Sequence, residues 1–119
     1  MQDFRKLRVW QKAHQLSLDI YKATKRFPKD EIYGLTSQIR RATVSIGANI
    51  AEGSCIVNSN AEIQRFLGMS LRSCDEVKLW LNFCRDLGYI EAERCEAYKS
   101  EYKEYGAMLY ALWKRHSRS

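Results

Sequence analysis

The sequence predicts an all-α fold, an antiparallel up-and-down four-helix bundle built as a single domain over residues 1–119. One proline and six glycines in the whole chain favour few turns and long regular elements. Apolar residues recur at steps of three and four along four separate segments, as one buried helix face requires. No segment shows the strict alternation of a half-buried strand. Long amphipathic helices joined by short connections are typical of antiparallel bundles.

The first predicted helix runs from about Arg5 to Arg26. Its inner face is apolar and consists of Val9, Ala13, Leu16, Ile20 and Thr24. The residue before a proline is pushed out of the α region, so Phe27 and Pro28 are expected to end this helix.

The opposite face of the first helix is basic. Residues 1–29 hold eight Lys or Arg against two Asp, which accounts for the whole formal net charge of +6. The cationic side chains of this face are Arg5, Arg8, Lys12, Lys22, Arg26 and Lys29. Such a face is either an ordinary solvated surface or a track of positive charge, about 30 Å long, that binds phosphates.

The second predicted helix covers about Thr36 to Glu52, with Gly53 as its C-terminal stop, and is expected to be the centre of the fold. Its apolar stripe is Leu35, Ile39, Ala42, Ile46 and Ile50. Gly47, Ala48 and Ala51 leave room for another backbone to approach.

A polar stripe runs beside that apolar stripe and consists of Gln38, Arg41, Ser45, Asn49 and Glu52. It is interpreted either as a ligand-binding site or as a hydrogen-bonded contact that fixes register between helices or subunits. Arg41 and Glu52 lie about three turns apart and cannot pair within one helix. Each therefore needs a partner elsewhere, and we prefer the structural interpretation.

The third predicted helix covers about Asn60 to Leu87, opened by a capping box of Ser59 and Glu62 and broken by Gly88. Its seam is Ile63, Leu67, Ser70, Cys74, Val77, Leu81 and Cys84.

The fourth predicted helix runs from about Glu91 to Lys114, with the seam Cys95, Tyr98, Tyr102, Tyr105, Leu109 and Leu112. Its three tyrosines form either a base-stacking platform or part of the core with their hydroxyls at the rim, and we prefer the core.

Metal, cofactor and membrane sites are not expected. The four cysteines form no C-x-x-C pair and the two histidines lie far apart, so neither a metal site nor a disulfide framework is predicted. Cys74 and Cys84 should pack as small hydrophobes. No apolar run reaches the roughly 18 residues that span a membrane, and no signal-peptide region opens the chain, so a cytoplasmic protein is expected.

Catalysis is not expected either. The carboxylates that could converge on a metal ion are Glu52, Asp75 and Glu76. Asp75 and Glu76 are adjacent and point about 100° apart on a helix, which argues against a shared ion. No phosphate-binding loop or nucleophile–base pair is present.

Several segments resemble a known family. They are FRKLRVWQKA at 4–13, IYKATKRFPKDEIYGLTSQIRRATVSIGANIAEG at 20–53, and Ser73 and Glu76 followed by LGYI at 87–90. They are similar to the bacterial four-helix bundle family, also called the rRNA intervening-sequence protein family because some members are encoded within insertions in large-subunit rRNA genes. The accessory variability protein of diversity-generating retroelements is also similar.

This resemblance covers nearly the whole chain and implies an up-and-down bundle that assembles into a ring-shaped homopentamer without known enzymatic activity. For the retroelement relative it implies binding of nucleic acid and of a reverse transcriptase through a basic surface. One departure is the run SLRS at 70–73, where a glycine would be expected just before the last serine.

Two functions are consistent with these observations. The first is a non-catalytic oligomeric module that binds nucleic acid, with structured RNA as the expected ligand, through the basic face of the first helix. The alternative is a protein–protein interaction scaffold whose basic face binds an acidic protein partner. The charge of the face does not separate the two.

Overall fold

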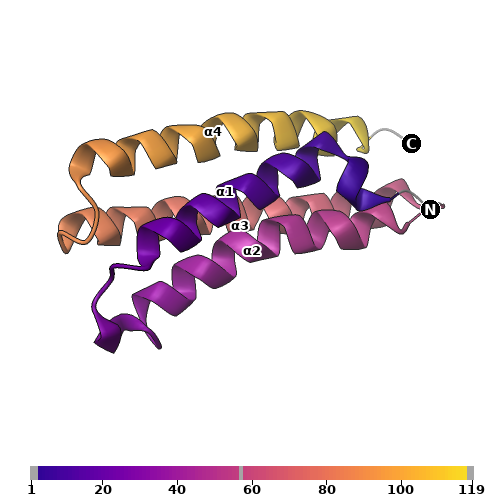
Figure 1. Ribbon diagram of the computed structural model, residues 1–119. Helices are drawn as coiled ribbons and strands as arrows, with labels where there is room; N and C mark the ends of the chain where they lie inside the picture. Colours follow the sequence, from indigo (N-terminus) through magenta and orange to yellow (C-terminus); the bar gives the residue numbers. More distant parts are fainter. Residues whose placement is uncertain (1–2, 57, 118–119) are drawn as a thin grey trace.

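The computed structural model describes residues 3–56 and 58–117, which form four α-helices, two 3₁₀ turns and no strand (Figure 1). The helices are α1 (Arg8–Thr24), α2 (Leu35–Ser54), α3 (Asn60–Asp86) and α4 (Ala92–Arg115), and the 3₁₀ turns are η1 (Phe4–Lys6) and η2 (Lys29–Glu31). They pack side by side into a body of 46 × 21 × 21 Å. The all-α four-helix prediction is confirmed.

Consecutive helices run in opposite directions, as Figure 1 shows. Between α1 and α2, Thr24 bonds Arg40 while the earlier Ser17 bonds the later Thr43. The same reversal holds for the remaining neighbours. The pairs Ser73–Ser45 and Ser70–Ile46 join α3 to α2, Arg85–Glu96 and Gln64–Trp113 join α3 to α4, and Leu16–Tyr102 and Val9–Tyr105 join α1 to α4. The antiparallel up-and-down order follows from these contacts.

The apolar stripes predicted from periodicity form the core. The α2 stripe from Leu35 to Ile50 is buried throughout. The seams of the other helices are buried as well, apart from half-buried positions at Val9, Ile63, Tyr98 and Leu112. Burial of these side chains on four facing stripes is the main favourable term that holds the bundle together.

A buried layer of hydroxyl groups crosses this apolar core and joins α1, α2 and α4. Tyr102 Oη lies 2.6 Å from Thr43 Oγ1 and also donates to the carbonyl of Leu16 at 3.3 Å. Ser17 Oγ donates to the carbonyl of Thr43 at 3.1 Å and lies 3.2 Å from Thr43 Oγ1. Because every hydroxyl in the layer has a partner, the three groups are buried without a large desolvation cost.

The fourth-helix tyrosines belong to the core. Tyr102 and Tyr105 are fully buried, which confirms the core interpretation and makes the base-stacking alternative wrong for these rings. Tyr105 Oη donates to the carbonyl of Val9 at 2.6 Å, so its hydroxyl ends inside the bundle rather than at the rim. Burial raises the pKa of both phenols. Tyr98 is half-buried and accepts a hydrogen bond from Arg94 Nη2.

The ends of α3 follow the predicted signals. Ser59 Oγ accepts from the backbone N–H of Glu62 at 3.1 Å, although the Glu62 carboxylate bonds Arg65 instead of completing the capping box. Gly88 has φ of 78° and ends the helix. Tyr89 N–H donates to the carbonyl of Cys84, which is the hydrogen bond of a Schellman ending.

The boundaries of the first two helices differ from the sequence prediction. Gly53 is not a stop: α2 continues to Ser54, and Gly53 is buried inside it, where an added Cβ would lie 3.3 Å from Phe66 Cβ. Close packing of α2 on α3 therefore explains this glycine. The first helix begins at Arg8 instead of Arg5 because Leu7 is extended, with φ −80° and ψ 129°, and it ends at Thr24.

Gly47 also has a different role from the one expected. An added Cβ would lie 3.4 Å from Trp10 Nε1, so the close neighbour of this glycine is an indole of α1 and no other backbone. Gly47 leaves room for the Trp10 ring against α2 inside the same chain. The small side chain of Ala48 is exposed and that of Ala51 is half-buried.

The Glu31 carboxylate links the connection between α1 and α2 to the turn between α3 and α4. Glu31 Oε2 accepts from Tyr89 Oη at 2.8 Å, and Glu31 Oε1 accepts from the backbone N–H of Leu35 at 3.1 Å. The hydrogen bond from Tyr89, followed by that from Leu35, lowers the pKa of Glu31. One side chain thus caps α2 and joins two loops distant in sequence.

Three of the four thiols lie in the core. Cys74, Cys84 and Cys95 are buried and free, whereas Cys55 is exposed. Burial raises the pKa of Cys74 and of Cys84 to about 12, so both remain protonated near neutral pH. The prediction that Cys74 and Cys84 pack as small hydrophobes is confirmed.

Candidate nucleic-acid interface

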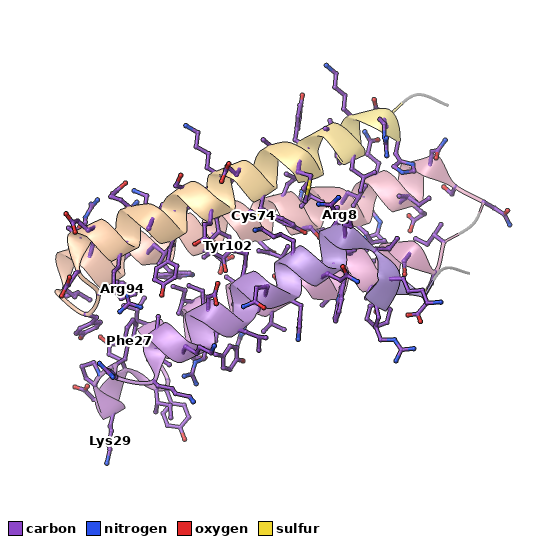
Figure 2. The ribbon with its side chains drawn as sticks, turned by 45° about the horizontal axis from the view of Figure 1, so that its top comes forward. Arg8, Phe27, Lys29, Cys74, Arg94 and Tyr102 are labelled. Atoms are coloured by element: carbon purple, nitrogen blue, oxygen red, sulfur yellow. The ribbon has the colours of Figure 1, made fainter. Side chains whose placement is uncertain are left out.

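The α1 basic face is the main charged feature of the molecule. We use this name for five exposed residues of α1 and the segment after it: Arg8, Lys12, Lys22, Arg26 and Lys29. None of them forms an ion pair within residues 3–56 and 58–117. Figure 2 shows Arg8 near the start of α1 and Lys29 beyond the opposite end of that helix. The face therefore extends along the whole helix.

The cations of this face form two groups, Arg8 and Lys12 in one and Lys22, Arg26 and Lys29 in the other. Asp19 lies between them, half-buried, and its Oδ1 accepts from Gln15 Nε2 at 3.1 Å. Lys12 and Lys22, on either side of Asp19, lie about 15 Å apart along the helix axis. An extended polyanion that contacts both groups would have to pass the Asp19 carboxylate, which accepts a hydrogen bond from the Gln15 amide.

Arg5 stands apart from the other predicted contacts. It lies in η1, and its guanidinium forms a two-pronged ion pair with Asp3, with Nε–Oδ1 at 3.0 Å and Nη2–Oδ2 at 3.1 Å. The side-chain hydrogen bond from Arg5 lowers the pKa of Asp3. A phosphate at Arg5 would have to compete with this carboxylate. Unlike the cations of the α1 basic face, Arg5 therefore has a carboxylate partner within the chain.

The polar stripe of α2 is used partly inside the chain. Ser45 Oγ bonds Ser73 Oγ on α3, and Asn49 Nδ2 donates to the carbonyl of Ser45 at 2.8 Å. Gln38 is half-buried on the same flank. The stripe thus contains one direct bridge between α2 and α3.

The two charged members of the stripe remain exposed. Arg41 and Glu52 form no ion pair or side-chain hydrogen bond with the part of the chain that the structure describes. The partners that Arg41 and Glu52 were expected to have on another helix are therefore absent from the described part of the chain. Both charges are available to another molecule.

Arg40 has a different role from its neighbour Arg41. Its Nε donates to Thr24 Oγ1 at 2.8 Å, and its guanidinium lies 4.6 Å from the centre of the Tyr21 ring. This cation therefore ties α2 to the end of α1 and contributes a cation–π contact. Helical periodicity does not reveal this role, because it depends on how α1 packs against α2.

Two of the three carboxylates considered for metal binding have local partners. Asp75 pairs with Lys78 at 3.1 Å, and Glu76 accepts from Trp80 Nε1 at 3.2 Å. Within residues 3–56 and 58–117, no three His, Cys, Asp or Glu side chains gather closely enough to hold an ion. In the same residues, no helix combines the length and the hydropathy needed to cross a bilayer.

Comparisons with known proteins agree with the all-α fold. Residues 5–111 match the family described as 23S rRNA-intervening sequence protein. Among solved structures, the chain is similar to the crystal structure of a protein with unknown function from the S23 ribosomal protein family from Bacteroides thetaiotaomicron VPI-5482. The two are 26% identical with a TM-score of 0.80, over 89% of this chain and 95% of that one. A comparison with curated proteins returns no match.

Proposed function

The chain belongs to the 23S rRNA-intervening sequence protein family, and we propose that it is a non-catalytic oligomeric module that binds structured RNA through the α1 basic face. The observation that carries the proposal is the row of exposed cations from Arg8 to Lys29 without acidic partners in the described residues. The rRNA in the family description supports RNA as the class of nucleic acid.

Binding of this kind is dominated by phosphate contacts. Lys and Arg on a helix surface neutralise phosphates and release counterions, so affinity falls steeply as salt rises and depends little on base sequence. If all five cations of the face contact phosphates, a plot of log affinity against log salt concentration should have a slope of about −3.5 to −4.5. A slope closer to zero would indicate that only one of the two groups of cations contacts phosphates.

Assembly would increase this affinity. We propose a homo-oligomer, a pentameric ring as the sequence resemblance implies, in which the exposed Arg41 and Glu52 of α2 contact neighbouring subunits. Repetition of the α1 basic face around the ring would then let modest contacts add through multivalency. The exposure of Arg41 and Glu52, without an ion pair among the described residues, supports this assignment.

The test is fluorescence anisotropy with a labelled structured RNA and two triple variants. The first variant, Lys12→Glu, Lys22→Glu and Arg26→Glu, reverses the α1 basic face. The matched control reverses three exposed cations on α3 and α4: Arg72→Glu, Lys103→Glu and Lys114→Glu. Both variants lower the net charge by the same amount, so any difference between them reports position and not overall charge.

We expect the first variant to lose at least about a hundredfold in affinity, since three contacts of roughly 1 kcal/mol each are removed and reversed. The control variant should lose less than about tenfold. Equal losses in the two variants, or unchanged affinity in the first, would refute the assignment of the face. A single acidic protein that remains stoichiometrically bound after nuclease treatment would instead support the protein-partner alternative.

A further inference from the structure

A cavity of about 500 Å³ opens at the end of the bundle where α1 begins, α2 ends, α3 begins and α4 ends. Figure 1 shows that these four helix ends meet at the end of the molecule near both chain termini. The apolar side chains of the wall come from all four of these helix ends: Leu7, Val9, Ile50, Ile56, Ile63, Leu67 and Leu112. A space of this size is within the range of small-molecule sites, about 300 to 1,000 Å³.

The walls of the cavity are built for an apolar body. Its side chains include Ile50 and Leu67, which are 3% and 4% exposed, while Ile63 and Leu112 are half-buried. These residues continue the core seams of α2, α3 and α4, so the cavity is an extension of the core that no described side chain fills. An aliphatic chain placed there would be removed from water much as a core side chain is.

The polar groups of the lining are predominantly basic. Arg115, the last residue of α4, and His116, which follows it, both line the cavity, and no acidic residue does. Arg115 forms no ion pair within the described chain. His116 Nδ1 lies 2.9 Å from Asn60 Oδ1, so the ring is held by α3 at the opening. The opening therefore complements a negative charge.

We propose that this cavity binds a small amphipathic carboxylate, with its aliphatic chain between Ile50, Leu67 and Leu112 and its carboxylate at Arg115. The charge of the opening selects the acid over a neutral or cationic molecule of the same chain length. The cavity lies at the Arg8 end of the α1 basic face, and the proposal does not rest on RNA binding.

Isothermal titration with decanoate tests the proposal, with 1-decanol and decyltrimethylammonium as probes of the same chain length. Decanoate should bind saturably, more tightly than decanol, and the cation should bind least. Octanoate should bind roughly tenfold more weakly than decanoate, since each buried methylene strengthens binding about threefold to fourfold. Absence of saturable binding by decanoate, or equal affinity for all three head groups, would overturn the proposal.

Two pairs of variants locate the binding site. Leu112→Trp fills the cavity and should abolish decanoate binding, whereas Leu79→Trp, on an exposed position of α3, should leave it unchanged. Arg115→Gln should weaken decanoate about fivefold without affecting decanol, and Lys114→Gln, an exposed neighbour outside the lining, should affect neither.

Arg115 is exposed, so its variant should fold even if Leu112→Trp does not. Decanoate affinity that is the same in Arg115→Gln as in Lys114→Gln would contradict the assignment of the head group. Decanoate binding that survives in a folded Leu112→Trp protein would place the ligand outside this cavity. RNA binding measured on the same variants should be unchanged, which separates this proposal from the function proposed for α1.

Discussion

Removal of the Tyr102 hydroxyl tests whether the buried polar layer stabilises the bundle. Tyr102→Phe keeps the ring and deletes the bonds to Thr43 Oγ1 at 2.6 Å and to the Leu16 carbonyl at 3.3 Å. Neither partner is orphaned, because Thr43 Oγ1 still lies 3.2 Å from Ser17 Oγ and Leu16 lies within the α1 hydrogen-bond ladder. We therefore expect a loss of about 1 kcal/mol in the free energy of unfolding, without the larger cost of an unpaired buried group.

A double-mutant cycle isolates the bond between Tyr102 and Thr43. Thr43→Val removes the other hydroxyl, and the coupling energy between the two substitutions should be about 1 kcal/mol. Tyr102→Ala should cost far more, about 3 to 5 kcal/mol, because it also leaves a cavity in the core. Tyr110→Phe on the exposed side of α4 is the control and should stay within about 0.5 kcal/mol of the wild type.

The assay is urea unfolding followed by far-ultraviolet circular dichroism at one fixed protein concentration, since the proposed assembly would make stability depend on concentration. A Tyr102→Phe protein as stable as the Tyr110→Phe control would refute the reasoning. A coupling energy near zero would show that the two hydroxyls do not stabilise each other.

Three further predictions follow from the placement of single side chains. A thiol reagent should modify Cys55 alone in the folded protein, and full reaction should require unfolding, because three thiols are buried. Rapid reaction of a second thiol in the folded protein would contradict the burial of these three. Glu31→Gln should lower the midpoint of thermal unfolding near neutral pH. Because the folded-state pKa of Glu31 is lowered, its contribution is present above the ordinary carboxyl pKa and lost as the pH falls through the lowered value. The difference between the two proteins in a series of melts should therefore shrink in acid, and a constant difference would count against this cap. Arg41→Ala should reduce the native mass measured by light scattering while leaving helicity intact. An oligomer of unchanged size would show that Arg41 is not needed for the subunit contact.

Periodicity predicted the core because burial of one helix face leaves a direct mark on the sequence. The α2 stripe from Leu35 to Ile50 and the α3 seam through Cys74 could both be recognised from steps of three and four. Ser59 and Gly88 could also be recognised, since a capping hydroxyl and a residue with positive φ each have few alternatives.

Features that depend on packing between helices could not be predicted in this way. Gly53 matched a helix stop, but the approach of Phe66 decides its role. Arg5 matched the helical spacing of the basic face, but the extended Leu7 places it outside α1, and it pairs with Asp3. The Tyr102 hydroxyl has partners from two other helices, which no local pattern specifies.

The sequence is also silent on the cavity at the end of the bundle. Most of its apolar side chains are end positions of the predicted seams, and such positions are expected to be filled by neighbours. Whether four seams close completely at a bundle end depends on helix lengths and on where each helix starts. The actual beginning of α1 at Arg8, three residues later than predicted, is one such detail.

The central claim, that this family member binds RNA through the α1 basic face, is tested most directly on freshly purified protein. The measurement is native mass and ultraviolet absorbance ratio before and after ribonuclease treatment, for the wild type beside the Lys12→Glu, Lys22→Glu, Arg26→Glu variant. We predict that the wild type carries ribonuclease-sensitive nucleic acid on a defined oligomer and that the variant forms the same oligomer without it. An oligomer of the wild type that is free of nucleic acid, or a variant that carries as much as the wild type, would contradict the claim.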